Sequence, residues 1–434
     1  MTRTCIIVSP YFPPSTLAGV HRARHLAKHV IGTGWTPIVV CVDEAFHEER
    51  LDPGLAALVP GSIEIVKVPA LDRRYCRPFG LGDISLRAWR PLRQAVLTLL
   101  ATRRIDAVFI TGSPYYPMLL AVEIKRRFGV PVVLDFQDPW VSAWGAALPR
   151  WSKGGVAHRL SEWLEPKAVR AADFITSVSD TQNAQLVARY PWLDASRMAA
   201  LPIGGDPADY DALRGRPLSD GGPVTWRTGQ ITLAYVGTFM PRTGPVMESY
   251  LQAFAAARAR SPSALANIRL LFVGTSNQPN DTATHRVLPM ARRLGLEACV
   301  EEIPQRLPYL DAIAVLSRAD GILLIGSDEP HYTASKIYPG LMSGRPWLSL
   351  FHGASSAHRI LSDAGGGITL SFSSAAELDK LTPAIGEAVI RLATAPQSLG
   401  HADPSAYEPF TARAIARSYA KIFESLRPSA SSEQ

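Results

Sequence analysis

Short apolar runs alternate with amphipathic segments along the first half of the chain. Runs of strand length cover residues 4–9, 37–42, 63–68, 107–111, 130–135 and 174–178. In residues 20–31, which lie between the first two runs, apolar side chains recur at the spacing of one helix face. Because strands that are apolar throughout are buried on both faces, this alternation predicts a parallel sheet with helices on both sides.

The alternation stops at residues 206–229 and then restarts. This stretch is rich in Gly, Pro and Asp, so we interpret it as an interdomain linker. Strand-like runs then cover residues 231–236, 268–273, 321–325, 347–350 and 367–370. The sequence therefore predicts an α/β protein with two Rossmann-like, doubly wound domains, 1–205 and 230–405. We expect a helix at 406–427 that packs back on the first domain, and a disordered tail at 428–434.

Two such domains in tandem constrain where a ligand binds. Open α/β sheets bind ligands outside the carboxyl ends of their strands, where the strand order reverses. We therefore expect the two domains to face a central cleft that takes a nucleotide or another phosphorylated ligand. The architecture alone does not choose between enzymes, because one fold hosts many chemistries.

Composition is that of a well-packed globular chain, with 434 residues of which 47% are hydrophobic and 19% charged. No apolar run is long enough to span a bilayer, and the first residues do not resemble a signal peptide, so we expect a cytoplasmic location. The cysteines are scattered and form no CxxC pair: Cys5, Cys41, Cys76 and Cys299. This pattern argues against a disulfide framework and against a zinc site.

The net charge of +7 permits an anionic partner, and the basic residues are unevenly distributed. Eight arginines and one carboxylate lie between Arg73 and Arg104. Within this segment Trp89, Leu92, Val96 and Leu99 recur at helical spacing. One interpretation is peripheral contact with an anionic membrane at the inner face of the plasma membrane. The other, favoured for the helix alone, is a core face with solvated arginines. We expect no nucleic-acid partner, because no binding motif is recognisable.

The loop that joins the first strand to the first helix covers residues 9–26. Gly19 lies at the helix start, where free backbone N–H groups favour an anion. The loop is not a GxGxxG fingerprint, so a dinucleotide site is not indicated. An ordinary structural turn is the alternative.

Six segments in a fixed order resemble the bacterial glycosyltransferases of the GT-B fold, family 4. They are SPYFPPSTLAGVHRARHLAKHV (9–30), VLDFQDPW (133–140), ADFITSVSDTQNAQLVARYP (172–191), LPIGGDPADY (201–210), AYVGTFMPRTGP (234–245) and EPHYTASKIYPGLMSGRPWLSLFH (329–352). Each segment alone is a weak signal, but the ordered set runs nearly from end to end of the chain.

This resemblance implies a GT-B architecture and a retaining, nucleotide-sugar-dependent transferase. The C-terminal domain would bind a nucleotide diphosphate sugar, and the N-terminal domain a glycan or lipid-linked acceptor. The resemblance also implies surface polysaccharide or glycoconjugate biosynthesis, no cofactor and no essential metal. The diphosphate leaving group gains negative charge during transfer, so the site needs preorganised donors and cations.

The resemblance directs attention first to the end of the strand at residues 231–236. Gly237 lets the backbone approach a diphosphate, and the hydroxyl of Thr238 can donate a hydrogen bond. Members of the family place an Arg and a Lys in slots that Thr238 and Thr243 occupy here, which is a departure. Arg242 is the nearest cation and would take their place, with a solvated surface arginine as the alternative.

A second group follows the strand at residues 321–325. Ser335 and Lys336 begin a predicted helix, and a lysine there adds a full charge to the helix dipole. Similar enzymes carry two glutamates seven residues apart around this loop. Glu329 is close to the first, whereas Pro339 occupies the second slot. The residues expected to hold sugar or ribose hydroxyls are Glu329, His331 and Tyr332.

The remaining expected site residues follow other strands. Gly274, Thr275 and Pro304 are expected to face the nucleotide, with ordinary turn chemistry as the alternative. In the first domain, Asp135 and Asp138 follow an apolar strand. Asp138 would orient or deprotonate the acceptor hydroxyl, or it simply caps the next turn. The tryptophans either line an acceptor groove or pack: Trp140, Trp144, Trp151 and Trp163.

Two other classes of function compete with transfer. A nucleotide-sugar epimerase of related fold would need acid and base side chains at the sugar carbon, and no obvious carboxylate pair is present. A non-catalytic nucleotide-sugar-binding protein gains support from the departures at Thr238, Thr243 and Pro339. The analysis of products separates an epimerised sugar from a transferred one.

Overall fold

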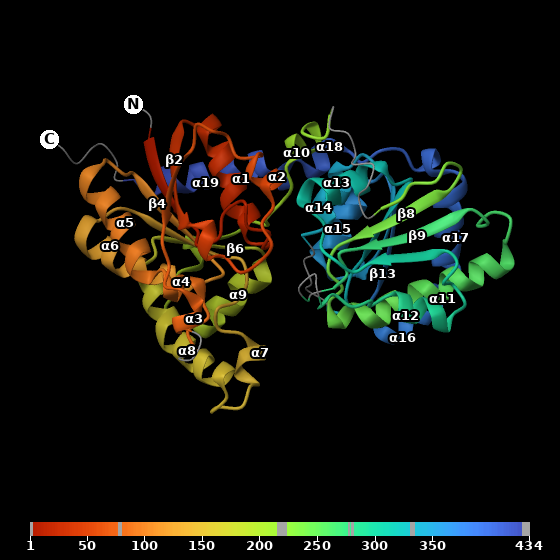
Figure 1. Cartoon of the computed structure of the whole chain (residues 1–434), viewed down its shortest axis with the longest axis horizontal. Coiled ribbons are helices and arrows are strands. Elements are labelled where there is room, and N and C mark those ends of the chain that lie inside the picture. The colour runs from red at the N-terminus through yellow and green to blue at the C-terminus, as the bar shows by residue number, and fades with distance from the viewer. Residues whose placement is uncertain are drawn as a thin grey trace. The chain divides into compact units, whose positions relative to one another are not determined.

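The computed structural model describes residues 3–76, 80–214, 224–276, 278, 282–329 and 335–427 (Figure 1). Its contacts divide the chain into two compact domains. The first comprises Met1–Ile203 and Ala412–Gln434, and the second comprises Gly204–Thr411. Each domain is built around one sheet of parallel strands.

The first domain has a seven-stranded sheet of order β3-β2-β1-β4-β5-β6-β7. Its strands are β1 (Arg3–Val8), β2 (Trp35–Val42), β3 (Glu64–Val68), β4 (Ala107–Gly112), β5 (Val132–Phe136), β6 (Phe174–Ser177) and β7 (Met198–Ala200). Its helices are α1 (Val20–Val30), α2 (Pro53–Ala56), α3 (Arg73–Cys76), α4 (Ile84–Arg87), α5 (Trp89–Thr102), α6 (Leu120–Phe128), α7 (Ala143–Ala146), α8 (Lys153–Ala171), α9 (Asp180–Arg189) and α19 (Ala412–Ser425).

Helices cover both faces of this sheet, as the apolar strands predict (Figure 1). Side chains alternate between the faces along a strand. Ile6 and Val8 of β1 therefore pack in one core with α5, α6 and α8. Cys5 and Ile7 pack in the other core with α1 and α19. The C-terminal helix thus returns to the first domain and supplies part of its core.

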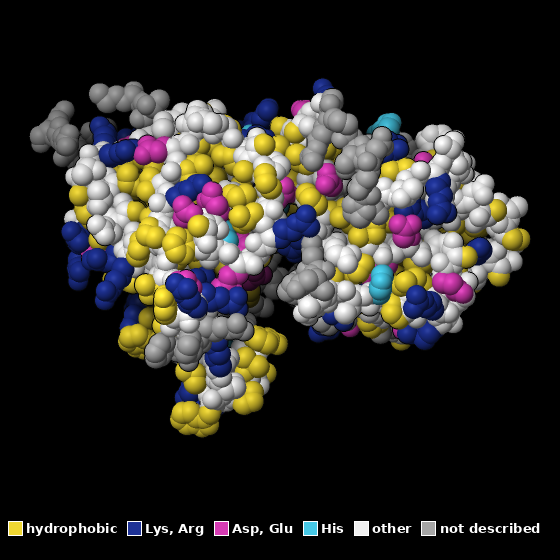
Figure 2. Space-filling model, in the orientation of Figure 1, with side chains coloured by type: hydrophobic (Ala, Val, Ile, Leu, Met, Phe, Trp, Pro, Cys, Tyr) yellow, Lys and Arg dark blue, Asp and Glu magenta, His cyan; other side chains and the backbone are white. Residues whose placement is uncertain are grey.

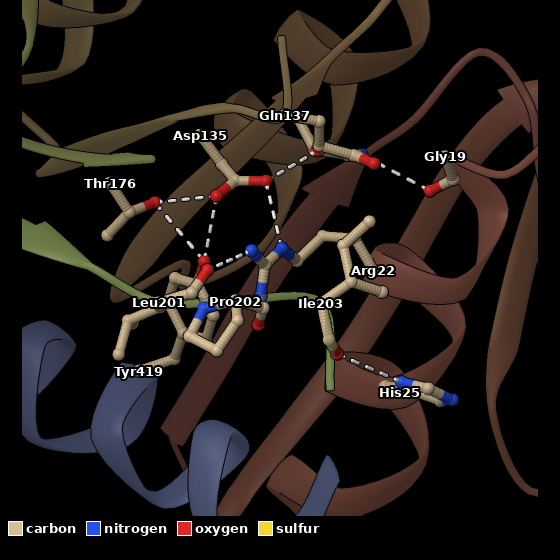
Figure 3. Close-up of polar contacts among 11 residues, drawn as sticks. Gly19, Arg22, His25, Asp135, Gln137, Thr176, Leu201, Pro202, Ile203 and Tyr419 are labelled. Atoms are coloured by element: carbon tan, nitrogen blue, oxygen red, sulfur yellow. Dashed lines mark hydrogen bonds and ion pairs between the residues drawn. The ribbon is translucent and has the colours of Figure 1, made fainter. Parts of the chain in front are cut away.

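A buried polar cluster joins the second of these cores to the sheet (Figure 3). Nε of Arg22 on α1 lies 3.1 Å from Oδ2 of Asp135 on β5, and both side chains are almost completely buried. Asp135 also accepts hydrogen bonds of 2.8 Å from the hydroxyls of Thr111, Thr176 and Tyr419. The guanidinium of Arg22 donates to the carbonyls of Leu201 and Pro202. The cluster therefore holds the chain where it leaves β7 and where it returns as α19.

The second domain has a six-stranded sheet of order β10-β9-β8-β11-β12-β13. Its strands are β8 (Ile231–Val236), β9 (Ile268–Val273), β10 (Val300–Ile303), β11 (Gly321–Ile325), β12 (Trp347–His352) and β13 (Ile368–Phe372). Its helices are α10 (Pro207–Asp211), α11 (Gly244–Arg260), α12 (Leu288–Arg293), α13 (Tyr309–Arg318), α14 (Ile337–Met342), α15 (Ser356–Ala364), α16 (Ala375–Leu378), α17 (Thr382–Thr394) and α18 (Pro404–Tyr407).

The observed elements follow the predicted pattern closely, with two strands missed. β7 has only three residues, which is too short to stand out as a strand, and β10 carries two glutamates, so it is not an apolar run. The structure also differs from the expected linker at 206–229. Residues 204–214 belong to the second domain, where Tyr210 donates a 2.6 Å hydrogen bond to the carbonyl of Pro339. The middle of that linker and the tail at 428–434 lie outside the described residues.

The arginine-rich segment contributes to the core and to ion pairs. Leu92, Val96 and Leu99 are buried in the first domain, and Trp89 packs against them. Most of the arginines pair with carboxylates, and Arg77 lies outside the described residues. Arg73, Arg87, Arg93 and Arg103 pair with carboxylates from distant parts of the chain, and Arg74 and Arg104 pair with aspartates two residues away. The apolar face of α5, which was one candidate for membrane contact, is therefore buried in the core of the domain. Within the described ranges, no helix is both long and apolar enough to cross a bilayer.

We predict that Asp135→Ala lowers the free energy of unfolding by about 3–5 kcal/mol, because it leaves the buried guanidinium of Arg22 unpaired. Urea denaturation of the whole chain measures this loss. Asp180→Ala, at an exposed position in the first turn of α9, is the matched control and should cost less than about 1 kcal/mol. Equal losses in the two variants would show that the cluster does not hold the domain.

Candidate functional site

The point where strand order reverses in the second sheet lies between β8 and β11, which are neighbours. The loop after β8 begins with Gly237, and the loop after β11 leads to Lys336. Gly237 has a φ of +147°, which L side chains rarely adopt. A Cβ added there would lie 3.2 Å from Cδ of Lys336. The backbone at Gly237 and the lysine side chain thus meet at the switch point, as expected for a ligand site.

The ammonium group of Lys336 lies in an apolar setting beside Tyr235 of β8. Its Nζ donates a 2.7 Å hydrogen bond to the Tyr235 hydroxyl and lies 4.3 Å from the centre of that ring. No carboxylate of the described residues forms an ion pair with it. Burial lowers the pKa of Lys336 to about 7, because a charged ammonium is poorly solvated there. An arriving anion would supply the missing counter-charge.

Backbone hydrogen bonds join the loops that follow β8, β9 and β10. The N–H of Gly237 donates to the carbonyl of Val273, and the N–H of Gly274 donates to that of Ile303, both at 2.9 Å. Gly274 has a φ of +70°, which again favours glycine. Ser276 continues the series with a 3.0 Å bond to the carbonyl of Pro304. The expected site residues Gly274 and Pro304 therefore shape one continuous edge of the sheet.

The two candidate threonines differ in what their hydroxyls do. Thr275 is fully buried, and its hydroxyl donates to the carboxylate of Glu302. That carboxylate also accepts the backbone N–H groups of Arg286, Val287 and Leu288. In this structure the Thr275 hydroxyl is therefore committed to holding the start of α12. Thr238 is only half-buried, and no described residue accepts a hydrogen bond from its hydroxyl.

Arg242 forms ion pairs with two carboxylates of the loop that follows β11. Its Nε lies 2.7 Å from Oδ1 of Asp328, and its Nη1 lies 3.6 Å from Oε1 of Glu329. The hydrogen bond to Asp328 is the main cause of a raised pKa for the guanidinium. The structure thus brings Arg242 and Glu329 together as an exposed ion pair, of the kind that exchanges readily. Asp328, which the sequence analysis did not single out, is the stronger partner.

The other residues of the second group have different outcomes. His331 and Tyr332 lie outside the described residues. Ser335 is exposed. Lys336 lies just before α14, which is a six-residue helix that begins at Ile337 rather than at Ser335. A helix this short adds little dipole, so the positive charge at the site comes from the lysine side chain.

Gly19 lies in the first domain, whereas the other expected donor-binding residues lie in the second. It directly precedes α1, and its carbonyl accepts a 3.2 Å hydrogen bond from the amide of Gln137 (Figure 3). A Cβ added at Gly19 would lie 3.4 Å from Oε1 of Gln137. The first backbone N–H of α1, that of Val20, bonds to the carbonyl of Leu17. Gly19 therefore allows a close approach of two loops.

The two candidate aspartates of the first domain, Asp135 and Asp138, have different surroundings. Asp135 does not face a ligand, because its carboxylate is enclosed in the cluster with Arg22. Asp138 lies beyond the strand end and is exposed, and no described residue hydrogen-bonds its carboxylate. Tyr115 donates a 2.8 Å hydrogen bond to the Asp138 carbonyl and stacks on Trp140 at 5.5 Å. Desolvation raises the pKa of the Asp138 carboxyl, which strengthens it as a base.

A small pocket lies beside Asp138 at the same edge of the first sheet. Pro139 and Trp140 form one wall of it, and α9 forms another. The side-chain Nε2 of Gln182 is buried there without a hydrogen-bond partner, and Asn183 lies next to it. Amide groups in such a place are suited to the hydroxyl of a sugar or to a bound water.

Comparison with known proteins adds to this geometry. Residues 18–204 match the family model described as a glycosyl transferase 4-like domain. The first domain is a glycosyl transferase 4-like domain. No curated protein matches the chain as a whole or in part.

Solved structures extend the likeness over the second domain. Anabaena HepE in complex with UDP and glucose is 14% identical, with a TM-score of 0.59, and the match covers 98% of this chain and 100% of that one. A glycosyltransferase from Rickettsia africae has a TM-score of 0.60 at 14% identity, with 98% of each chain covered. The E. coli trehalose-6-phosphate structure bound with UDP-2-fluoro glucose has a TM-score of 0.62 at 12% identity, with 98% and 100% covered. The fold is GT-B, and with the first domain it identifies the chain as a glycosyltransferase.

Sequence reasoning missed several side chains of this glycosyltransferase that the structure places at or beside the expected sites. Tyr235 positions Lys336, and its one signal is a hydroxyl in a strand whose neighbours are aliphatic. Asp328 directly precedes Glu329, and only Glu329 was singled out by the family resemblance. Gln182 lies on α9, and its amide group is the only sequence feature that could have indicated a functional role. Among the predicted site residues that are described, Gly237 meets Lys336, and Arg242 pairs with Glu329.

Proposed function

We propose that this glycosyltransferase moves a sugar from a nucleotide diphosphate sugar to a hydroxyl of a glycan or lipid-linked acceptor, with retention of configuration. The observation that carries the proposal is the meeting of the Gly237 backbone and the Lys336 side chain at the switch point of the second sheet. HepE is described with UDP and glucose, so a uridine diphosphate sugar is the first donor to test.

The donor half of the reaction breaks the bond between the sugar C1 and the diphosphate oxygen. Negative charge then grows on the leaving diphosphate, and a fixed cation that is poorly solvated beforehand stabilises that charge strongly. Lys336 fits this task, because it has no carboxylate partner among the described residues. Gly237 leaves its backbone open to the phosphates, and Thr238 offers a free hydroxyl. Glu329, with Arg242, is proposed to hold hydroxyls of the sugar or ribose.

The acceptor half forms a bond from the acceptor oxygen to C1. The hydroxyl proton passes either to the departing diphosphate oxygen or to the carboxylate of Asp138. Asp138 supports the second route through its exposed, unbonded carboxylate and its raised pKa. The nearby amides of Gln182 and Asn183 are proposed to hold other acceptor hydroxyls.

The biological setting follows from the acceptor class. We propose that the protein acts in the cytoplasm, peripheral to the inner face of the plasma membrane, in surface polysaccharide or glycoconjugate synthesis. The expectation that no metal is required stays part of this proposal. The lysine and the loop backbone are the groups in the described chain that would replace a metal at the diphosphate.

The pH dependence of donor binding is the first prediction. Lys336 has a lowered pKa in the free protein, so its charge is present below about pH 7 and is lost above it. A bound diphosphate favours the charged form, so binding takes up a proton and weakens as the pH rises above 7. We expect the affinity for UDP-glucose to fall by up to about tenfold per pH unit above pH 7. Calorimetric titration measures this, with a diphosphate diester that loses no proton in this range.

Lys336→Met removes the charge and keeps much of the length, so its affinity should be low and nearly independent of pH. The matched control is Lys380→Met, at an exposed position of the same domain, which should behave like the unchanged protein. A steep pH profile that persists in Lys336→Met would remove this lysine from the donor site.

Product analysis with a labelled nucleotide sugar tests the reaction itself. With an extract of bacterial glycolipids and glycans as acceptor, we expect the label to move to an acceptor and the nucleoside diphosphate to be released. Lys336→Met should lower this rate by about 10²–10³-fold while leaving the thermal unfolding midpoint nearly unchanged. Release of an epimerised sugar would instead support the epimerase, and tight donor binding without turnover would support the non-catalytic protein.

A further inference from the structure

The first domain carries a helical projection whose tip and one side are apolar and exposed. It consists of α7, the turn that follows it and α8, and yellow side chains gather at its free end in Figure 2. Three tryptophans stand out on it, with exposed fractions of 75% for Trp144, 84% for Trp151 and 61% for Trp163. Tryptophan is usually well buried, so three exposed indoles on one projection call for a partner.

The exposure of these tryptophans does not come from a loose loop. A Cβ at Gly145 would lie 2.4 Å from the ring of His158, and one at Gly155 would lie 2.2 Å from the carbonyl oxygen of Pro149. These glycines let α7 and the following turn pack directly against α8. Ser142 and Ser152 cap the two helices through 3.1 Å hydrogen bonds. The projection is therefore a built element that presents the indoles to solvent.

Helix α8 has two faces with different tasks. One face carries Ala168 and Val169, which are buried in the core of the domain. The opposite positions are exposed and follow one another at spacings of three and four residues, which places them on one stripe. The stripe reads Lys153, Val156, Leu160, Trp163 and Lys167. It is about 21 Å long at the rise of an α-helix, and it is apolar in the middle and basic at both ends.

The charges on the projection favour an anionic partner. Its basic residues are Arg150, Lys153, Arg159, Lys167 and Arg170. Glu162 is the exposed acidic residue, whereas Glu165 is buried and pairs with Arg189 at 2.6 Å. Two of the cations lie over the exposed indoles, Arg159 over Trp151 and Lys167 over Trp163.

A second exposed apolar group adjoins the start of α8. A Cβ added at Gly80 would lie 3.6 Å from Cε of Lys153, so the chain at Gly80 lies beside the projection. Leu71, Tyr75 and Leu81 are exposed in it, and the guanidinium of Arg74 lies 4.7 Å from the centre of the Tyr75 ring. The combination of exposed aromatic side chains with arginine is repeated here.

We propose that the α7–α8 projection is a membrane-docking element that places its indoles at the headgroup level of an anionic bilayer. Tryptophan prefers the membrane interface, because its ring is apolar and its N–H is polar. The flanking lysines and arginines would bind the lipid phosphates and carboxylates, and their stems would cover the apolar stripe. The inference deepens the proposed function, since it rests on an acceptor that is presented at a membrane. It assigns the contact to this projection rather than to α5, whose apolar face is in the core.

Vesicle flotation tests the docking element without any sugar donor. We expect the protein to float with vesicles of phosphatidylcholine mixed with an equal amount of phosphatidylglycerol, and to float much less with phosphatidylcholine alone. The triple variant Trp144→Ser, Trp151→Ser, Trp163→Ser should lose at least about tenfold in the partition coefficient. Lys153→Glu with Lys167→Glu should lose a similar factor on the anionic vesicles and little on the neutral ones.

Trp192→Ser is the matched control. Trp192 is also exposed, but it contacts Arg170 at the opposite end of α8 from Trp151, and its loss should leave flotation unchanged. Binding of UDP-glucose and the unfolding midpoint should stay unchanged in all of these variants, which shows that each one is folded. If the unchanged protein does not bind UDP-glucose, that result counts against the proposed function but not against docking.

Two results would overturn the docking proposal. One is a failure of the unchanged protein to float with anionic vesicles, or flotation that is the same in the tryptophan variants. The other is a dimer in sedimentation that the triple tryptophan variant abolishes while flotation persists. That result would make the stripe a contact between copies of the chain.

Discussion

The buried ion pair between Arg22 and Asp135 is the interaction on which the first domain depends. Removing both charges from water is costly, and the cost is offset because Asp135 accepts four hydrogen bonds and Arg22 also binds two carbonyls. Its partners come from α1, three neighbouring strands, the chain after β7, and Tyr419 of α19 (Figure 3). The chain leaves the domain at Ile203 and re-enters it at Ala412. The cluster therefore fastens both ends of the inserted second domain to one sheet.

The second domain also holds a charged side chain at the carboxyl end of its sheet, but among the described residues this charge has no ion-pair partner. There the strand order reverses between β8 and β11, and the backbone at Gly237 meets the side chain of Lys336. Lys336 lies at this point, half-buried beside Tyr235, with a lowered pKa and no ion-pair partner among the described residues. Such a charge is costly until an anion arrives. The buried ion pair of the first domain therefore stabilises its structure, whereas Lys336 of the second domain is proposed to bind a ligand.

The sequence was sufficient for most of the fold, because the strands are continuous apolar runs that only a covered parallel sheet can bury. β8, β9 and β11 begin and end at the predicted residues. β10 was missed because it contains Glu301 and Glu302, and only the tertiary structure shows that Glu302 is buried to hold α12.

The site was predicted less completely, for the same kind of reason. Lys336 was a candidate because a lysine stands out before an apolar helix. Partners are not visible in a sequence, so the enclosure of Asp135 by Arg22 and the ion pair of Arg242 with Asp328 emerge only from the tertiary structure. The exposed apolar stripe of α8 shows the converse case. An apolar stripe at helical spacing usually predicts a buried face, and here it is the uncovered one.

A crystal structure of the protein with UDP-glucose tests the central claim most directly. The account predicts that the diphosphate binds the backbone at Gly237 and the Nζ of Lys336, with the sugar toward Glu329. A diphosphate bound elsewhere, with Lys336 still hydrogen-bonded only to Tyr235, would contradict it.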